Sequence, residues 1–439
     1  MKAPQILNDL LARVTEVGES LMTRAKARPV SLTNRCEDLL TGAGEATGLA
    51  LASEILERYQ RLDRDEKHAF FVDLHARFGV DFALLAASID AWQSAPDDTT
   101  ARDLHFACEP RSQELIRRLN RVPGGTAALV AMRADLLRSL RDEPVLKQLD
   151  RDFHHLFSSW FNRGFLELRA IDWSTPAAIL EKIIAYEAVH QINGWDDLRR
   201  RVAARDRRLY AFFHPALTNE PLIFVEVALA RDIPDAIGPV LAEGRDEMDP
   251  RDATTAVFYS ISNCQPGLRG VSFGNFLIKQ VVEELRRQFE NLDTFVTLSP
   301  VPGLRRWARA QCSVEESALT EAQQAAVALL DPVDGSIEGA AMADAVEKLP
   351  GIAARYLVEA HGSQGGAADP VARFHLGNGA RLERINPGAD HSARGLETAW
   401  GVMVNYLYHL ADIEKNHEAY ATLGEIKHSP SVRHLLRAR

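Results

Sequence analysis

The stretch from Thr255 to Ser299 decides the fold. It opens with TAVFYSIS (255–262), an apolar and β-branched run that predicts a strand. A glycine-bearing loop, QPGLRGVSFG (265–274), separates this strand from NFLIKQVVEELRRQF (275–289), whose apolar residues recur at helical spacing. TFVTLS (294–299) predicts a second strand. Strand, loop, helix and strand in this order predict an α/β unit with neighbouring strands.

The loop of this unit has the residue types of an anion cradle. Glycines at 267, 270 and 274 permit positive φ and a close approach of the backbone. Amide N–H groups from Arg269 to Asn275 would then point at an anion near the start of the helix, where the helix dipole favours negative charge. Arg269 and Lys279 add formal positive charge.

Its spacing excludes two common phosphate motifs. No GK[ST] follows, so it is not a Walker loop, and it lacks the Rossmann glycine spacing. The loop is similar to the turn with which GNAT-type acyltransferases hold the pyrophosphate of CoA. A glycine turn that only packs the helix on the sheet remains the alternative.

Further strands and helices are predicted on both sides of the unit. Upstream, FLELR (165–169) alternates like a strand, a helix begins at Ser174, and two strands are predicted near 209–213 and 222–229. Downstream, the Gly- and Ala-rich segment 362–368 predicts a loop before a last, mainly helical portion.

The first part of the chain has a different character. Its apolar residues recur at helical spacing with almost no β-branched alternation, as in Ile55, Leu56, Tyr59 and then Phe70, Phe71, Leu74, Phe78. Glycine is sparse before Asn162 and frequent after it. We therefore expect an α+β protein overall, with an all-helical domain at 1–162 and an α/β domain at 163–439.

Composition excludes several classes of protein. The 439 residues, 46% hydrophobic and 26% charged, are enough for a substantial core without metal or disulfide staples. Lys and Arg number 51 against 61 Asp and Glu, and this net charge of -10 argues against a nucleic-acid binder. No apolar run reaches the length of a membrane span. The four cysteines are far apart and outside any zinc-type spacing, which predicts free thiols in a reducing compartment, the cytoplasm.

Short motifs across residues 160–410 carry a resemblance to a known family. They are WFNRGFL (160–166), EAVHQ (187–191), WDDLRRRV (195–202), LSPVPG (298–303), FHLGNGA (374–380) and NYLY (405–408). In their residues and in their order along the chain, these motifs resemble those of the malonyl-CoA decarboxylase family. The resemblance implies a helical domain used in oligomerisation and a GNAT-like catalytic domain. It also implies conversion of malonyl-CoA to acetyl-CoA and CO2 in fatty acid metabolism, with no metal or organic cofactor, no nucleic acid or membrane partner, and a homodimer or tetramer.

The same resemblance assigns site residues. The family's serine falls on Ser299, its histidine on His375, and a tyrosine near its site on Tyr408. The residues of the CoA loop are Arg269, Gly270, Val271, Ser272, Phe273, Gly274 and Asn275. Many relatives carry a glutamate where this chain has Ser272. The resemblance therefore leaves the catalytic or orienting role of that glutamate unassigned in this chain.

These residue types suit the implied chemistry. Loss of CO2 from a malonyl thioester leaves an enolate that the enzyme must hold and protonate. A serine hydroxyl and an imidazole supply hydrogen bonds and a proton, although Ser299 before Pro300 also fits a turn and most histidines are structural. No G-x-S-x-G elbow surrounds Ser299, so we interpret Ser299 and His375 as a hydrogen-bonding and proton-transfer pair, without deciding which gives the proton.

Two other functions compete with this hypothesis. A GNAT-type N-acyltransferase would share the CoA loop but would need an amine acceptor. A sensor of CoA esters would bind malonyl-CoA without turnover. The basic run from Arg199 to Arg208 predicts a solvated helix face, with the 3′-phosphate of CoA as a further partner to consider.

Overall fold

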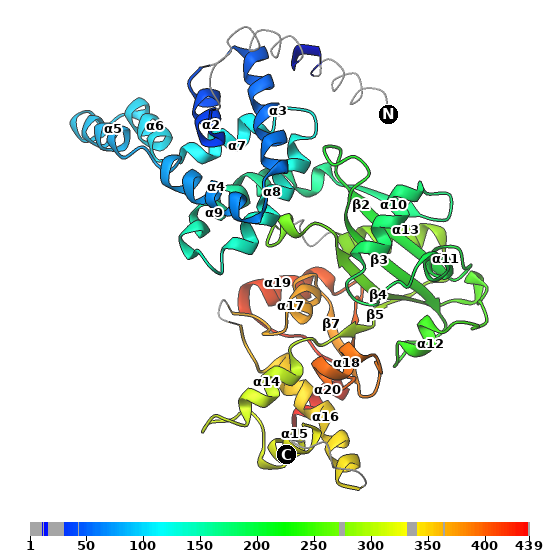
Figure 1. The fold of residues 1–439 in the computed structure, drawn as a ribbon. Coiled ribbons are helices and arrows are strands. Elements are labelled where there is room, and N and C mark those ends of the chain that lie inside the picture. The colour runs from blue at the N-terminus through cyan, green and yellow to red at the C-terminus, as the bar shows by residue number, and fades with distance from the viewer. Residues whose placement is uncertain are drawn as a thin grey trace. The chain divides into compact units, whose positions relative to one another are not determined.

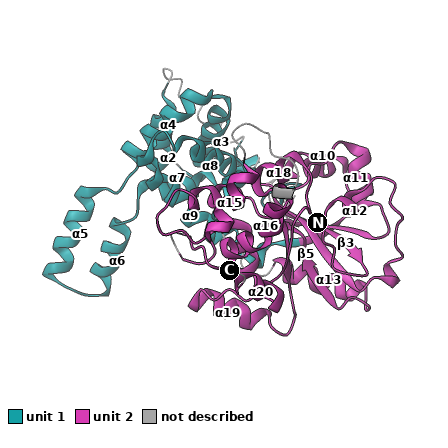
Figure 2. Cartoon of the chain, turned by 90° about the horizontal axis from the view of Figure 1, so that it is seen from below, with its two compact units in different colours: residues 1–167, 213–222, 265–273 teal, residues 168–212, 223–264, 274–439 magenta. Residues whose placement is uncertain are grey.

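The computed structural model describes residues 11, 13–15, 30–42, 44–271, 277–331, 340–362 and 365–437. The chain divides into two compact units, each described by itself (Figure 2). The helical unit comprises residues 1–167, 213–222 and 265–273, and the sheet unit comprises residues 168–212, 223–264 and 274–439. The short segments 213–222 and 265–273 each begin at or just after the end of a strand, but they belong to the helical unit.

The helical unit consists of short amphipathic helices with polar caps. Asp63 and Asp97 each begin a helix with a capping box, which satisfies amide groups that the first turn leaves free. Phe71, Phe78 and Phe157 are fully buried between the helices. The helices are α2 (Leu32–Leu40), α3 (Glu45–Arg61), α4 (Arg64–Arg77), α5 (Phe82–Ser94), α6 (Asp98–Ala107), α7 (Arg111–Leu119), α8 (Gly125–Ser139) and α9 (Lys147–Trp160), with the 3-10 turns η1 (Pro144–Leu146), η2 (Arg163–Phe165) and η4 (Pro266–Leu268).

The sheet unit holds the remaining helices and the strands, apart from end residues of the first three strands (Figure 1). Its strands are β1 (Glu167–Ile171), β2 (Arg207–Phe213), β3 (Pro221–Ala230), β4 (Thr255–Asn263), β5 (Thr294–Thr297), β6 (Ser299–Pro300), β7 (Arg381–Asn386) and β8 (Met403–Leu407). Its helices are α10 (Ala177–Tyr186), α11 (Trp195–Val202), α12 (Gly238–Leu241), α13 (Leu277–Gln288), α14 (Leu304–Gln311), α15 (Glu321–Leu330), α16 (Ala340–Val358), α17 (Pro370–Gly377), α18 (Ala393–Ala399), α19 (Ile413–Leu423) and α20 (Pro430–Arg437), with the turn η3 (Pro250–Asp252).

Within the described ranges the strands form one mixed sheet in the order β1-β2-β3-β4-β5-β8-β6, with β7 paired to β8. Strands β4 and β5 run parallel, and Phe258 lies opposite Thr297. They are joined through α13, which is the α/β unit predicted from the sequence. Strands β3 and β4 are antiparallel, as are β5 and β8. The predicted fold class, a helical region followed by an α/β domain, is confirmed.

The core of the sheet unit lies against its central strands. Val257 and Tyr259 of β4 pack with Val296 of β5, Leu298 and Met403 of β8, and each of these residues is at most 2% exposed. Because β4 and β5 are buried on both faces along most of their length, their apolar residues follow one another directly, as at 256–259 and 295–296, rather than alternating with exposed polar ones. This is why the strand signal was strongest at this point of the chain.

One expectation about the sheet unit was incomplete and another was partly wrong. The portion after residue 368 is mainly helical, as expected, with α17 to α20, but it also contributes β7 and β8, short strands whose RLERIN and MVNYL sequences mix polar with apolar residues. In the basic run, Arg199, Arg200 and Arg205 are exposed as expected, but Arg201 and Arg207 are each only 5% exposed. Arg201 donates to the carbonyls of His190 and Gln191, and Arg207 donates to that of Val240.

The structure also describes the state of the four cysteines and the apolar character of the helices. Cys36 and Cys264 are buried, Cys108 and Cys312 are exposed, and all four are free thiols, as predicted. Across the described ranges, none of the helices combines the length and the apolar character that crossing a membrane requires.

Candidate active site

Three side chains assigned to the site from sequence meet inside the sheet unit. Nε2 of His375, on α17, lies 3.2 Å from Oγ of Ser299, the first residue of β6. Nδ1 of the same imidazole lies 2.8 Å from the hydroxyl of Tyr408, which directly follows β8. The exposed fractions are 5% for Ser299, 3% for His375 and 1% for Tyr408. The structure therefore brings the serine, histidine and tyrosine into one buried hydrogen-bonded set.

Local sequence explains how α17 presents His375. Asp369 caps the helix by accepting from the amides of Val371 and Ala372, and Pro370 occupies its first position. His375 lies in the last turn, and the chain then reverses at Gly379, whose φ of +84° suits glycine. A Cβ at Gly379 would also lie 2.2 Å from the carbonyl oxygen of Ile413.

Burial sets the protonation state of the imidazole. Removal from water disfavours the charged form and lowers the pKa of His375 to about 3. Burial also raises the pKa of Tyr408 well above its usual value, so the phenol keeps its proton. At neutral pH both groups are therefore uncharged.

The direction of the hydrogen bonds follows from this neutrality. The buried Tyr408 hydroxyl has Nδ1 of His375 as its one acceptor among the described residues, so it donates to Nδ1. The imidazole proton then lies on Nε2 and faces Ser299. The Ser299 hydroxyl donates in turn to Oγ1 of Thr297 at 2.9 Å. A chain of donors thus runs from Tyr408 to Thr297.

Sequence reasoning missed two neighbours of this set. Thr297 accepts from Ser299 and from the backbone amide of Tyr406. The ring of Tyr406 stacks on that of His375, with centroids 4.8 Å apart and planes at 23°. Each missed residue stands two positions before a residue that was assigned, Ser299 or Tyr408, and a period of two keeps side chains on one face of a strand. That spacing was the signal that could have found them.

Asn405, on the opposite face of β8, cross-links the sheet unit. Its amide donates to the carbonyl of Thr297 at 2.8 Å, and its Oδ1 accepts from Asn386 at 2.8 Å and from Arg384 at 3.1 Å. Asn405 is fully buried. These contacts hold β8 against β5 and so fix the register on which the positions of Tyr408 and Ser299 depend.

The residues assigned to the CoA loop are described in part. Arg269 and Gly270 are exposed and Val271 is buried. Ser272, Phe273, Gly274 and Asn275 lie outside the described residues. Lys279, which was expected to add charge, forms an ion pair with Glu414 at 2.5 Å.

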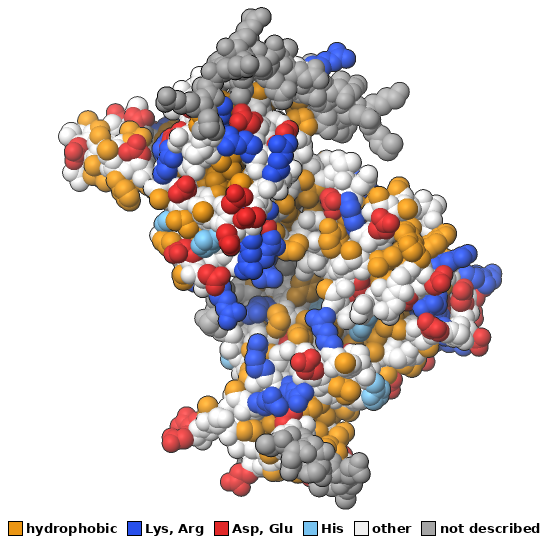
Figure 3. All heavy atoms as spheres, viewed as in Figure 1, with side chains coloured by type: hydrophobic (Ala, Val, Ile, Leu, Met, Phe, Trp, Pro, Cys, Tyr) orange, Lys and Arg blue, Asp and Glu red, His pale blue; other side chains and the backbone are white. Residues whose placement is uncertain are grey.

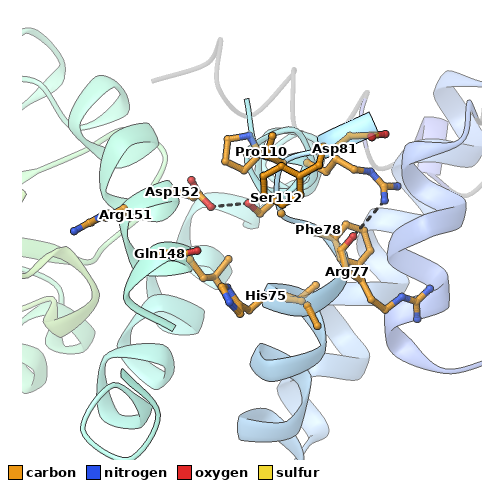
Figure 4. A pocket seen from close by; sticks show the side chains of 16 residues that line it. His75, Arg77, Phe78, Asp81, Pro110, Ser112, Gln148, Arg151 and Asp152 are labelled. Carbon is orange, nitrogen blue, oxygen red and sulfur yellow. Dashed lines mark hydrogen bonds between the residues drawn. The ribbon is translucent and has the colours of Figure 1, made fainter. Parts of the chain in front are cut away.

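Among the described residues, the assigned site neither contains a group of metal-ligating side chains nor lines the cavity of the helical unit that Figure 4 shows. In the ranges that the structure describes, no group of His, Cys, Asp or Glu is arranged to hold a metal ion. A cavity of about 600 Å³ lies in the helical unit between α4, α7 and α9 (Figure 4). Ser112 donates to Asp152 at 2.6 Å on its wall, and none of the assigned site residues lines it.

Comparison with known proteins shows what this architecture is similar to. The model of the malonyl-CoA decarboxylase C-terminal domain matches residues 164–439, and that of the malonyl-CoA decarboxylase N-terminal domain matches residues 78–161. The mitochondrial malonyl-CoA decarboxylase of Anser anser anser is 35% identical over 416 residues, covering 87% of this chain and 82% of the relative. That of Rattus norvegicus is 34% identical, covering 97% of this chain and 90% of the relative.

Solved structures agree. The crystal structure of malonyl-CoA decarboxylase from Rhodopseudomonas palustris is 51% identical with a TM-score of 0.89, covering 92% of this chain and all of that one. That from Agrobacterium vitis is 53% identical with a TM-score of 0.85, covering 92% of this chain and 99% of that one. Matches of this extent place the chain among the carboxy-lyases. Within them, it belongs to the malonyl-CoA decarboxylase family.

Proposed function

We propose that this chain converts malonyl-CoA to acetyl-CoA and CO2, and that Ser299 and His375 hold and protonate the enolate formed when CO2 leaves. The observation that carries the mechanism is the buried contact of 3.2 Å between Nε2 of His375 and Oγ of Ser299. The family and the relatives named above support the substrate.

In the proposed reaction the bond between the α-carbon and the carboxylate breaks. Its electron pair passes into the thioester, and the enolate charge gathers on the thioester oxygen. Fixed donors that strengthen as this charge develops lower the barrier, and a buried setting makes them effective. In the proposal Ser299 is such a donor. Its oxygen stays within hydrogen-bond distance of Nε2 of His375, while its hydroxyl proton turns from Thr297 toward the substrate.

The α-carbon then takes one proton. In the proposal the Ser299 hydroxyl supplies it, since a thioester enolate carbon is a stronger base than an alkoxide. The Nε2–H of His375 stabilises the serine oxygen by a hydrogen bond until water returns the proton. Tyr408 keeps the imidazole in this tautomer by donating to Nδ1. No step requires a metal or an organic cofactor, and their dispensability is part of the proposal.

The deciding experiment is incubation with malonyl-CoA as the sole substrate. We expect equal amounts of acetyl-CoA and CO2, and no loss of activity after treatment with a metal chelator. Release of products only when an amine is added would indicate an N-acyltransferase. Tight binding without turnover would indicate a sensor.

We further propose that the chain forms a homodimer or tetramer through its helical unit. The hairpin of α5 and α6 carries exposed apolar side chains, with Phe82 78% and Phe106 68% exposed. Leu84 and Trp92 on α5 add to this surface, and hydrophobic side chains are visible over the hairpin in Figure 3. Apolar groups gathered on one projecting element are typical of an association surface.

Cytoplasmic location also stays a proposal. Free thiols at Cys36, Cys108, Cys264 and Cys312 fit a reducing compartment. The curated relatives are named as mitochondrial proteins. Cell fractionation with an antibody to this chain tests the proposal, and recovery of the chain in an organelle fraction would contradict it.

A further inference from the structure

A buried arginine of the helical unit holds the turn that begins the assigned CoA loop. Arg133, on α8, is 2% exposed. Its Nε donates to Oδ1 of Asp150 at 2.8 Å, and its Nη1 donates to the carbonyl oxygens of Gly267 at 2.8 Å and Arg269 at 2.9 Å. Burying a guanidinium costs free energy unless its donors are satisfied, so these two carbonyls are integral to the burial of Arg133.

The turn is seated on the helices at several further points. A Cβ added to Gly267 would lie 1.9 Å from the carbonyl oxygen of Val130, which shows how closely the turn backbone approaches α8. Nε2 of His154, on α9, lies 3.1 Å from the carbonyl oxygen of Gly270. The carbonyls of residues 267, 269 and 270 therefore all contact side chains of the helical unit.

These contacts fix the orientation of one amide in particular. No peptide bond in the described ranges is cis, so the N–H of a peptide points away from its C=O. With the carbonyl of Arg269 bound to Arg133, the N–H of Gly270 points to the other side of the chain. That N–H has no hydrogen-bond partner among the described residues.

The side chain of Arg269 is likewise without a hydrogen-bond partner among the described residues. It is exposed, and its guanidinium forms no hydrogen bond or ion pair with the described residues. Among the described residues, the amide of Gly270 and the guanidinium of Arg269 are thus both unpaired, and they lie next to each other on a backbone that Arg133 holds from the opposite side. Both are donors suited to phosphate oxygens.

We propose that Arg133 is a positioning residue for the phosphate-bearing part of the CoA ester. It acts through the backbone of Gly267 and Arg269, and orients the Gly270 amide and the Arg269 side chain before substrate arrives. This inference rests on the proposed function in one respect, that the ligand is a CoA ester. It gives the helical unit a part in substrate binding that association between copies does not require.

The test compares a substrate with phosphates to one without. Arg133→Met is expected to raise the Kd of free CoA, measured by calorimetry, about tenfold or more, since a charged donor to two carbonyls is lost. KM for malonyl-CoA should rise in proportion with little change in kcat. With malonyl-pantetheine, which has the same reacting group but no phosphates, kcat/KM should stay at the wild-type value.

Arg138→Met is the matched control. Arg138 lies on the same helix with its side chain 65% exposed and pairs with Asp135 rather than with the turn. It should leave the Kd of CoA unchanged. Arg133→Lys keeps the charge but has a single donor nitrogen, so we expect a smaller rise in the Kd of CoA. Its effect on kcat/KM should again be confined to the phosphate-bearing substrate. This variant also serves if Arg133→Met does not fold.

The outcomes separate the two proposals. If the wild type binds CoA but makes no acetyl-CoA, the proposed function fails, and the Kd of CoA still tests Arg133. A folded Arg133 variant with the wild-type Kd overturns the positioning role. So does an equal loss of kcat/KM with both thioesters, which would mark Arg133 as merely structural. A wild-type chain that binds no CoA overturns the inference as well.

Discussion

The hydroxyl of Tyr408 lies 2.8 Å from Nδ1 of His375, whereas Nε2 of that ring lies 3.2 Å from Ser299. One imidazole thus connects the end of β8 with the start of β6. Its burial keeps it neutral, and the phenol decides which nitrogen bears the proton. The predictions below follow from this arrangement and from the exposed hairpin of the helical unit.

Ser299→Ala removes the donor proposed to face the enolate. We expect kcat for malonyl-CoA to fall by about 100- to 1000-fold, as for other fixed donors to a developing oxyanion, with the Kd of CoA unchanged. Product release from malonyl-CoA gives kcat, and calorimetry gives the Kd. Ser313→Ala, at an exposed serine after α14, is the control. Full activity of the Ser299 variant would exclude its role.

Tyr408→Phe removes the donor to Nδ1 but keeps the ring, which packs edge-on against Phe258 with centroids 6.4 Å apart. We expect kcat to fall about tenfold and the free energy of unfolding to drop by about 1–3 kcal/mol, because a buried acceptor on His375 is left unpaired. Nitrogen NMR should show the proton of His375 redistributed between its two ring nitrogens.

The control for this change is Tyr210→Phe, which loses a hydrogen bond of 3.2 Å to Gln288. It should affect stability without lowering kcat. If the two variants had the same kcat, Tyr408 would have no part in setting the tautomer for catalysis.

The buried imidazole also predicts how stability depends on pH. The pKa of His375 is lowered from 6.5 to about 3 by burial, so between these values the unfolded chain binds a proton that the folded chain does not. Above about pH 6.5 the neutral imidazole costs the folded chain no stability. As the pH falls below that value, the free energy of unfolding decreases, because protons bind to the unfolded chain only. From pH 6.5 to 5 this group alone should cost up to about 2 kcal/mol.

Urea unfolding of the wild type and of His375→Gln at both pH values measures this contribution. The variant should lose less stability on acidification than the wild type. His434→Gln, at an exposed histidine on α20, should keep the wild-type difference. Equal losses for the wild type and the His375 variant would contradict burial of a neutral imidazole.

The exposed hairpin predicts a change in assembly. Phe82→Ser combined with Phe106→Ser removes two of its most exposed apolar side chains. Sedimentation should show a smaller species than the wild type, with the melting temperature of the monomeric fold little changed, because neither ring is part of the core. A second double variant, at the exposed Val314 and Leu423 of the sheet unit, controls for lost surface hydrophobicity. An unchanged sedimentation coefficient would place the association surface elsewhere.

Sequence patterns were sufficient where a segment is buried on both faces or strongly periodic. The apolar runs of β4 and β5 and the stripe of α13 predicted the parallel pair, because such patterns depend on local spacing alone. Strands β7 and β8 escaped notice, since their polar residues are satisfied by partners far along the chain. Asn405 of β8, bonded to the carbonyl of Thr297, is an example.

By itself, the sequence determined that this is a helical region followed by an α/β domain, and its motifs determined the family and the three residues of the buried set. Only the tertiary structure decided which nitrogen of His375 faces Ser299, that Thr297 and Tyr406 complete the set, and that Arg133 holds the backbone of Gly267 and Arg269. The physical reason is common to all of these. Protonation state and hydrogen-bond direction depend on burial and on partners distant in sequence, and spacing along the chain encodes neither.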